Sequence, residues 1–399
     1  MSSPKRVCVL TSSFPRFEGD EASVFVGRLV QAFSEVGLSG VVVCPVDQDE
    51  PLSERQGSFG ISRFRYGLFT RGCLAYGQGI LTNIKTHPLR IFQIPFFLYQ
   101  LFYQGWKRRN DWDIIHANWI VCGIPAYVLS RMTGKPYYVT LRGVDMKLLR
   151  VPLLRRLLSF FLNRASHIVS VNFAFLTELQ HSRLCRTDRL TCIPNGASVE
   201  SFTDEEKLRF LRERILSLDK QYILFVSRVI PLKRVEILIE ALANLENQNT
   251  ELLLVGRFQE DYRAKLEELA RKLDCLSRVR FEGAVGAKEI ALYHSVATLY
   301  ASASSWEGRS NSVAEALVAG TPVVVSEIPG HSELVENGID GVLVSEETTE
   351  AYAAAFGELL HDADRRKRYA KAGKEKMKEF TWKAAAERYC ELFSADTGG

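Results

Sequence analysis

Short apolar runs alternate with longer segments of helical period through the second half of the chain. Short apolar runs between polar turns are typical of strands that are buried on both faces. Strand, helix and strand in repeated succession predict a parallel sheet with helices on both faces. The expected strands are 222–226, 251–255, 279–281, 298–301, 322–326 and 341–344, and the expected helices are 235–245, 261–273, 288–295, 312–319 and 331–336.

The first half follows the same order with longer insertions. The segment 57–110 is rich in aromatic residues and arginine and fits neither period. The whole pattern predicts an α/β fold with two doubly wound, Rossmann-like domains that face a cleft, since sheets of this kind bind ligands beyond the carboxyl ends of their strands. In this half we expect a helix at 23–35 and strands at 6–10, 40–45, 113–116, 137–141, 167–171 and 190–193.

The composition excludes several other classes of protein. Of the 399 residues, 46% are hydrophobic and 25% are charged, which is typical of globular chains with two or three domains. No 18-residue window is free of charge, and the apolar stretch near the start is too short for a signal peptide. The eight cysteines form no Cys-x-x-Cys pair, so we expect a reduced, cytoplasmic chain without disulfides or a zinc site.

The net charge of +4 conceals a difference between the two halves. Residues 1–200 carry 24 basic and 14 acidic side chains, whereas residues 201–399 carry 27 and 33. The first half therefore has a net charge of +10 and the second a net charge of −6. A basic half suggests an anionic partner such as lipid headgroups, nucleic acid or a phosphorylated substrate.

Two cations follow the expected strand at 222–226. Arg228 and Lys233 lie between that strand and the next expected helix. Both side chains donate charge-assisted hydrogen bonds to phosphate oxygens, so together they are suited to hold a diphosphate. From this stretch alone, a solvated basic turn is an equally good interpretation.

Two glutamates lie eight positions apart around the expected helix at 312–319. Glu307 lies in a loop of small residues, and Glu315 lies inside the helix. The helix begins near Gly308 and residues 310–312, where free amides and the positive end of the helix dipole suit a phosphate. A carboxylate on each side of an anion site is best explained by hydrogen bonds from sugar or ribose hydroxyls.

These motifs closely resemble those of family-4 retaining glycosyltransferases, which belong to glycosyltransferase group 1 and have the GT-B fold. The resemblance rests most on Ser227-Arg-Val-Ile-Pro-Leu-Lys and on the two glutamates, of which Glu315 is followed by Ala-Leu-Val-Ala-Gly-Thr-Pro-Val-Val. It implies an acceptor-binding domain over 1–200, a donor-binding domain over 201–380 and a last helix, within 381–399, that crosses back to the first domain. Further matching motifs are Phe14-Pro, Leu74-Ala-Tyr-Gly, Ile115-His-Ala-Asn-Trp, Thr140-Leu-Arg-Gly-Val-Asp, Ile193-Pro-Asn-Gly and Phe380-Thr-Trp.

The resemblance implies roles for single residues on the donor side. Arg228 and Lys233 would hold the donor diphosphate, and Glu307 would contact hydroxyls of the donor sugar. Glu315 would accept hydrogen bonds from the ribose. The remaining donor-binding positions, which would line the phosphates, the sugar and the base, are Gly19, Gly283, Val285, Gly308, Arg309, Ser310, Asn311 and Ser312.

On the acceptor or sugar side, the resemblance implies a site with His116, Asn118, Arg142 and Asp145. Arg142 and Asn118 stand where family members often have histidine. Arginine cannot act as a base, because its pKa exceeds about 12, but it can bind an anionic group of the acceptor or the donor. For His116, a structural role within a strand is an equally good interpretation.

The implied reaction is the transfer of a hexosyl-type group from a nucleotide-diphosphate sugar, with UDP favoured over GDP, to a hydroxyl acceptor. Cations and helix amides would stabilise the charge on the leaving phosphate, so neither a metal nor a cofactor is expected. The expected setting is the synthesis of cell-surface polysaccharide, lipopolysaccharide or glycolipid. Two alternatives are another GT-B enzyme, such as a nucleotide-sugar epimerase or a phosphorylase, and a non-catalytic protein that binds nucleic acid or a partner; the donor motifs speak against nucleic acid.

Two stretches of the basic half combine apolar or aromatic residues with cations. Residues 89–106 are aromatic and precede Lys107-Arg-Arg. Both stretches suit an anionic bilayer surface, which predicts peripheral contact with the inner face of the membrane and a lipid-linked or anionic acceptor. Packing of the apolar faces on the sheet is the alternative. In residues 152–163, Arg155, Arg156, Ser159 and Asn163 share one helical face, and Leu153, Leu154, Leu157, Leu158 and Phe161 share the other.

Overall fold

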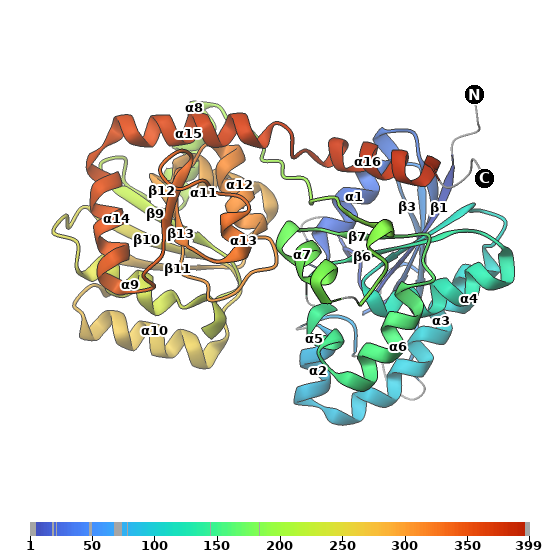
Figure 1. Ribbon diagram of the computed structural model, residues 1–399. Coiled ribbons are helices and arrows are strands. Elements are labelled where there is room, and N and C mark those ends of the chain that lie inside the picture. The colour runs from blue at the N-terminus through green and yellow to red at the C-terminus, as the bar shows by residue number, and fades with distance from the viewer. Residues whose placement is uncertain are drawn as a thin grey trace. The chain divides into compact units, whose positions relative to one another are not determined.

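The computed structural model describes residues 5–17, 20, 22–47, 50–67, 74–77, 79–143, 145–182 and 184–395. They form two compact units, of which the first contains Met1–Gly196 and Trp382–Gly399 and the second contains Ala197–Thr381. In each unit, helices cover a central sheet (Figure 1). Both units therefore have the layered α/β architecture that the alternation of strands and helices predicts.

The first unit is built on a sheet in which the described strands have the order β3-β4-β2-β1-β5-β6-β7-β8. Neighbouring strands are parallel except β3 and β4, which pair antiparallel. The strand order reverses between β1 and β5, because β2 and β4 lie on one side of β1 and all later strands lie on the other. The strands are β1 (Arg6–Thr11), β2 (Ser39–Pro45), β3 (Ser53–Gln56), β4 (Phe59–Phe64), β5 (Ile114–Asn118), β6 (Tyr137–Leu141), β7 (His167–Ser170) and β8 (Leu190–Cys192).

Helices bury both faces of this sheet. One face packs against α1 (Val24–Glu35) and α16 (Trp382–Ala395), with Phe33, Tyr138 and Phe393 in the core between them. The opposite face packs mainly against longer helices that follow β4, β5, β6 and β7. The helices after α1 are α2 (Ile80–Thr86), α3 (Ile94–Lys107), α4 (Gly123–Thr133), α5 (Asp145–Leu149), α6 (Pro152–Leu162) and α7 (Phe173–Ser182).

The second unit has a sheet in which all paired strands are parallel, in the order β11-β10-β9-β12-β13-β14. Its strand order reverses between β9 and β12. The strands are β9 (Gln221–Val226), β10 (Thr250–Val255), β11 (Val279–Gly283), β12 (Leu299–Ser302), β13 (Val323–Ser326) and β14 (Gly341–Val344). The helices are α8 (Asp204–Glu213), α9 (Val235–Ala243), α10 (Glu260–Lys272), α11 (Ala287–Val296), α12 (Asn311–Ala319), α13 (Pro329–Ser332), α14 (Thr349–His361) and α15 (Ala363–Met377).

Most of the elements expected from the sequence are present, although the helix expected at 331–336 is observed as the shorter α13 at Pro329–Ser332. The segment 57–110 supplies structure that periodicity did not predict. It contains β4, which pairs with β3, and the helices α2 and α3. In β4 nearly every residue is buried, so apolar and polar positions do not alternate. In α3 apolar residues lie on exposed as well as buried positions, which weakens its helical period. Among the described residues, we find no helix with the length and apolar character that crossing a membrane requires.

Acid is expected to destabilise both units through buried histidines. His294 of α11 is buried beside Tyr300, and neither of its ring nitrogens has a hydrogen-bond partner among the described residues. Burial lowers the pKa of His294 from 6.5 to about 3, and burial does the same to His116 in the first unit. Folding favours the neutral ring, so the free energy of unfolding is not reduced by these histidines above pH 6.5. Below pH 6.5, each histidine lowers the free energy of unfolding by about 1.4 kcal/mol per pH unit.

We therefore expect His294→Phe to keep more of its stability in acid than the wild type. The phenyl ring fits the aromatic stack and takes up no proton. Calorimetric unfolding temperatures of both proteins, compared between about pH 7.5 and about pH 5, measure the difference. The matched control is His361→Phe, at an exposed position of α14. If acid lowers the unfolding temperature of His294→Phe and of the wild type by the same amount, protonation of His294 does not cause the loss of stability.

Candidate functional site

The predicted donor residues meet where the strand order of the second unit reverses. Strands β9 and β12 are neighbours in the sheet, so the loops that follow them lie side by side. The loop after β9 contains Arg228 and Lys233, and the loop after β12 contains Glu307. Doubly wound sheets bind their ligands beyond the carboxyl ends of the strands at such a reversal. The fold thus brings together residues that lie more than 70 positions apart in the sequence.

Lys233 and Glu307 form an ion pair in this place. The lysine side chain is 10% exposed and the glutamate side chain 17%. Ser304 Oγ donates a hydrogen bond of 3.0 Å to Glu307 Oε1, the same oxygen that contacts Lys233. A Cβ atom on Gly330 would lie 2.6 Å from the carbonyl oxygen of Glu307, so only glycine fits against this loop. The carboxylate and the ammonium group are therefore held in a fixed, largely desolvated place.

A buried chain of hydroxyl groups, which the sequence did not single out, supports Ser304. Its Oγ lies 3.0 Å from Ser302 Oγ, and its carbonyl oxygen accepts a hydrogen bond of 2.7 Å from Ser326 Oγ. His331 Nδ1 in turn lies 2.9 Å from the carbonyl oxygen of Ser326. All four side chains are buried. The sequence feature that could have predicted these linked hydroxyl groups is a small polar residue at the end of each of two neighbouring strands, β12 and β13.

Backbone turns that require glycine surround Arg228. The Arg228 side chain is exposed at the carboxyl end of β9. A Cβ on Gly256, at the end of β10, would lie 1.9 Å from the carbonyl oxygen of Ser227. Gly256 donates a hydrogen bond of 2.7 Å to the carbonyl oxygen of Gly283, which has a positive φ of 80°. Val285 is half-buried just beyond. The tight turns at the ends of β10 and β11 leave this edge of the sheet lined by backbone.

Helix α12 begins at the predicted phosphate-binding segment. Ser310 is its N-cap, and the hydroxyl accepts a hydrogen bond of 3.4 Å from the Val313 amide. Asn311 is exposed, and Gly308, Ser312 and Glu315 are half-buried. The amides of the first turn and the positive end of the helix dipole therefore lie at the carboxyl edge of the sheet, close to Glu307 in the chain.

Arg309 has a different place from the one that the sequence predicted. Its Nε lies 3.2 Å from Glu333 Oε1, and the two side chains are 2% and 8% exposed. Its guanidinium also covers the ring of Phe380 at 5.4 Å. Contact of this cation with a ligand would require separating the buried pair, which is costly. In this structure Arg309 pairs with Glu333, and its contact with the donor stays a prediction.

In the first unit, Asn118, Arg142 and Asp145 lie together at the carboxyl ends of β5 and β6. Arg142 donates hydrogen bonds of 2.5 Å to Asn118 Oδ1 and 3.0 Å to Asn195 Oδ1. Asp145 is completely buried and accepts hydrogen bonds from the backbone amides of Ile120 and Arg142, at 2.8 and 2.5 Å. Burial raises the pKa of Asp145 to about 6. Through these hydrogen bonds, Asp145 links the backbone that follows β5 to the backbone that follows β6.

His116 is part of the core and does not reach a ligand. It is completely buried, and its Nε2 lies 2.8 Å from Thr140 Oγ1. Rings of Phe33, Tyr389 and Phe393 surround it, with centroids 5.0 to 6.0 Å away. The period of strand β5 explains this, since His116 points to the α1 and α16 side of the sheet whereas its neighbours point to the other. Of its two interpretations, the structural one holds.

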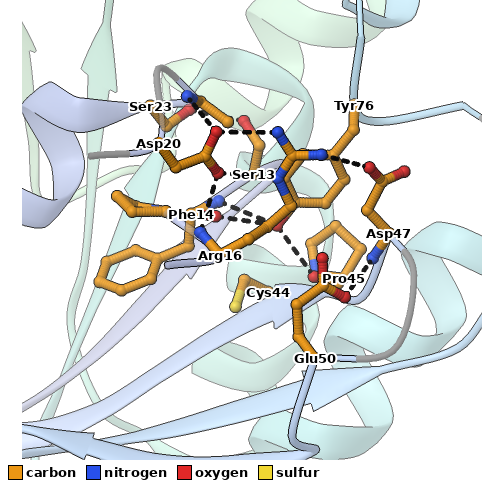
Figure 2. A network of polar contacts seen from close by, with 12 residues as sticks. Ser13, Phe14, Arg16, Asp20, Ser23, Cys44, Pro45, Asp47, Glu50 and Tyr76 are labelled. Carbon is orange, nitrogen blue, oxygen red and sulfur yellow. Dashed lines mark hydrogen bonds and ion pairs between the residues drawn. The ribbon is translucent and has the colours of Figure 1, made fainter. Parts of the chain in front are cut away.

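A polar network that the sequence did not predict holds Phe14, Arg16 and Asp20 after β1 (Figure 2). Arg16 forms ion pairs with Asp20 at 2.7 Å and Asp47 at 2.5 Å. The Tyr76 hydroxyl lies 3.0 Å from the carbonyl oxygen of Phe14 and 3.1 Å from that of Pro45. Two of the matching motifs, Phe14-Pro and Leu74-Ala-Tyr-Gly, thus contact each other. Their presence in the sequence is the feature that could have predicted this network. Gly19, the predicted donor-side glycine of this loop, lies outside the described residues.

Comparisons with known proteins identify related chains. The family described as "Glycosyl transferases group 1" matches residues 209–376, and the one described as "Glycosyltransferase Family 4" matches residues 22–201. "D-inositol 3-phosphate glycosyltransferase" of Xylanimonas cellulosilytica is 31% identical over 53% of this chain and 52% of that protein. The protein of the same name from Thermobispora bispora is 26% identical over 71% and 70%. The first match thus spans about half the length of that relative.

Solved structures have the same fold. HepE from Anabaena, in complex with UDP and glucose, has a TM-score of 0.76 at 19% identity and covers 98% of this chain and 100% of its own. Sucrose-phosphate synthase from Thermosynechococcus elongatus has a TM-score of 0.78 at 20% identity, with the same coverage. These similarities show the GT-B fold. Because the two family matches together span most of both units, the chain belongs to the group 1, family 4 glycosyltransferases.

Proposed function

We propose that this glycosyltransferase moves a hexosyl-type group from a UDP-sugar, in preference to a GDP-sugar, to a hydroxyl acceptor with retention of configuration. The observation that carries the proposal is the Lys233–Glu307 pair at the strand reversal of the second unit. The solved complexes of HepE with UDP and with UDP-glucose support a uridine donor. A GT-B fold does not by itself determine the substrate, so the preference for a donor depends on the residues of the site.

In the proposed complex the donor binds along the carboxyl edge of the second unit. The diphosphate contacts Arg228, Lys233 and the amides at the start of α12, where Ser310, Asn311 and Ser312 stand. Glu315 accepts hydrogen bonds from the ribose, and the base lies against the backbone of Gly283 and Val285. Glu307 accepts hydrogen bonds from sugar hydroxyls with the carboxylate that Ser304 already orients. The diphosphate competes with Glu307 for Lys233.

The proposed chemistry is the same for any sugar held in this way. The bond from the anomeric carbon to the diphosphate oxygen breaks, and the bond to the acceptor oxygen forms on the same face. The acceptor hydroxyl gives its proton to the leaving phosphate. Negative charge grows on that phosphate, so Arg228, Lys233 and the helix amides stabilise the transition state more than the ground state. These groups stabilise the charge that a metal ion stabilises in other transferases, so the proposal includes no metal and no cofactor.

A nucleotide screen with product analysis tests the proposal. UDP and UDP-hexoses are expected to raise the unfolding temperature more than GDP and GDP-mannose do, and Glu315→Ala to reduce the UDP effect. With a membrane extract as acceptor, UDP should be released in the presence of EDTA, and NMR of the product should show the anomeric configuration of the donor. If no nucleotide stabilises the protein, the donor assignment is wrong, and an inverted product would overturn the same-face mechanism.

We propose further that the acceptor is lipid-linked or anionic and that the first unit contacts an anionic membrane from the cytoplasmic side, in cell-surface glycan or glycolipid synthesis. Residues 85–164 carry 13 basic and 3 acidic side chains. Helices α3, α4 and α6 pack in that order and expose apolar side chains. We call these residues the apolar face: Phe96, Tyr99, Tyr103, Val128, Met132, Leu153, Leu157 and Phe160.

The leucines of α6, which we expected on one helical face, differ in their exposure to solvent. Leu158 is buried and packs on the sheet side, whereas Leu153 and Leu157 are 80% and 48% exposed. Arg155 and Arg156 are exposed on the same helix. Exposed apolar side chains beside cations fit a bilayer with anionic headgroups, because such a surface binds both.

Flotation with vesicles tests the membrane contact. The wild type is expected to float with phosphatidylglycerol vesicles in low salt and to float less with phosphatidylcholine vesicles or in high salt. Leu153→Glu with Leu157→Glu should abolish flotation, since a charge replaces apolar area at the centre of the contact. The control is Leu218→Glu, at a position of the second unit that is 71% exposed. Equal flotation of both variants would rule out the apolar face as the contact.

A further inference from the structure

Arg142 lies where the first unit is built to hold a ligand. Its strand order reverses between β1 and β5, and Asn118 is the last residue of β5, in register with Thr11 of β1. Arg142 directly follows β6, the next strand along, and contacts Asn118. A reversal of strand order opens a crevice beyond the carboxyl ends of the strands, which is where doubly wound sheets bind ligands. Arg142 and Asn118 line that edge within the first unit alone.

The charge of Arg142 is not balanced by a carboxylate in an ion pair within the described part of the chain. Its guanidinium donates to two amide oxygens, those of Asn118 and Asn195, and lies 4.2 Å from the centroid of the Phe25 ring. Asp145, the nearby carboxylate, accepts backbone N–H groups instead. Burial lowers the pKa of Arg142 to about 10, which leaves the side chain charged at neutral pH. Asp145 acts on Arg142 through its charge without an ion pair, so the N–H groups of the guanidinium stay available to another acceptor.

Two N–H groups at this site have no acceptor among the described residues. They are Nε of Arg142 and Nδ2 of Asn118, and both atoms are buried. Asn118 is 2% exposed, whereas Arg142 is half-buried and so keeps part of its surface open. A buried donor without an acceptor is costly and uncommon in folded proteins. Two such donors beside a cation that has no ion-pair partner among the described residues favour an acceptor that carries negative charge.

We propose that Arg142 and Asn118 form an anion-binding subsite that takes a phosphate or carboxylate group of the acceptor. This inference rests on the proposed function, since it specifies the class of acceptor for the transfer. The planar guanidinium suits both anions, because its N–H groups match the spacing of two oxygens of either group. Asn118 Nδ2, which has no acceptor among the described residues, supplies a further donor for the same anion. Asn195 and the Phe25 ring hold the guanidinium in place before the anion arrives.

The ¹⁵Nε–¹H NMR signal of Arg142 in the full chain, assigned by its loss in Arg142→Lys, provides a direct test. Inorganic phosphate and acetate are titrated with UDP at saturation, so that the donor site is occupied. We expect the Arg142 signal to shift and its exchange with water to slow with at least one anion, and the comparison of the two distinguishes phosphate from carboxylate. If the Arg142 signal responds to neither anion, the proposal is wrong.

Variants provide the second measurement. Arg142→Gln is expected to lower the affinity for the preferred anion at least about tenfold. The control is Arg150→Gln, an exposed arginine whose Nη2 lies 3.1 Å from Glu178, which should leave that affinity unchanged. Equal affinities in Arg142→Gln and Arg150→Gln would overturn the subsite. UDP binding is measured on the same samples: if UDP binds and the anions do not, only the subsite fails, and if the anions bind and UDP does not, the proposed donor function fails.

Discussion

Lys233→Met is expected to lower kcat/KM for sugar transfer about 10²–10³-fold, as the loss of one preorganised donor to a developing negative charge does in other enzymes. Lys233 is the cation closest to Glu307, and only 10% of its side chain is exposed. In a place with so little water, its charge acts on the leaving phosphate at a low effective dielectric constant. The variant also leaves Glu307 without its cation, which should weaken the hold on the donor sugar.

The chain offers a matched control for this substitution. Lys220 directly precedes β9, at the opposite end of the same strand, and forms an ion pair with Glu251, whose side chain is 8% exposed. Lys220→Met thus removes a similar pair far from the carboxyl edge. It should change stability without changing UDP binding or kcat/KM. The comparison requires the rate of UDP release and the unfolding temperature of both variants; equal losses of activity in the two would show that Lys233 has no special role.

Phe393→Ala is expected to destabilise the first unit by about 3–5 kcal/mol, the range for large-to-small changes of buried aromatic residues. Phe393 is 1% exposed, and its ring centroid lies 4.8 Å from that of Tyr138 and 6.1 Å from that of Phe33. It joins α16 to the sheet and to α1, so its loss leaves a cavity between three elements. At about 2–4 °C per kcal/mol, the unfolding temperature of this unit should fall by about 6–20 °C.

Calorimetry separates this effect from a general loss of stability. Glu387→Ala is the control, because Glu387 is exposed on the same helix. The second unit contains no residue of α16, so the UDP-dependent transition should stay in place in Phe393→Ala while the other transition moves. A chain that ends at Thr381 should lose the first transition altogether. If Phe393→Ala unfolds at the temperature of Glu387→Ala, α16 is not part of the core of the first unit.

Much of the proposed donor site could be predicted from the sequence because its residues lie in two short segments. Arg228 and Lys233 are five positions apart, as are Glu307 and Ser312, and both segments directly follow strands of a predicted parallel sheet. Carboxyl ends of parallel strands share one edge, so local spacing already places these side chains near one another. Arg309 shows the limit of such reasoning. Its neighbours in sequence belong to the proposed phosphate-binding segment, yet its own side chain pairs with Glu333, which is 24 positions away.

The sequence alone determined the fold class, most of the strands and helices outside 57–110 and the two segments that carry the donor motifs, because periodicity and turn residues act over a few positions. Only the tertiary structure decided which side chains meet. It paired Lys233 with Glu307, placed His116 in the core and left Arg142 with a charge that no ion pair among the described residues balances. These outcomes depend on the order of strands in the sheets and on which face of a strand each residue occupies, and both are set by packing between distant segments.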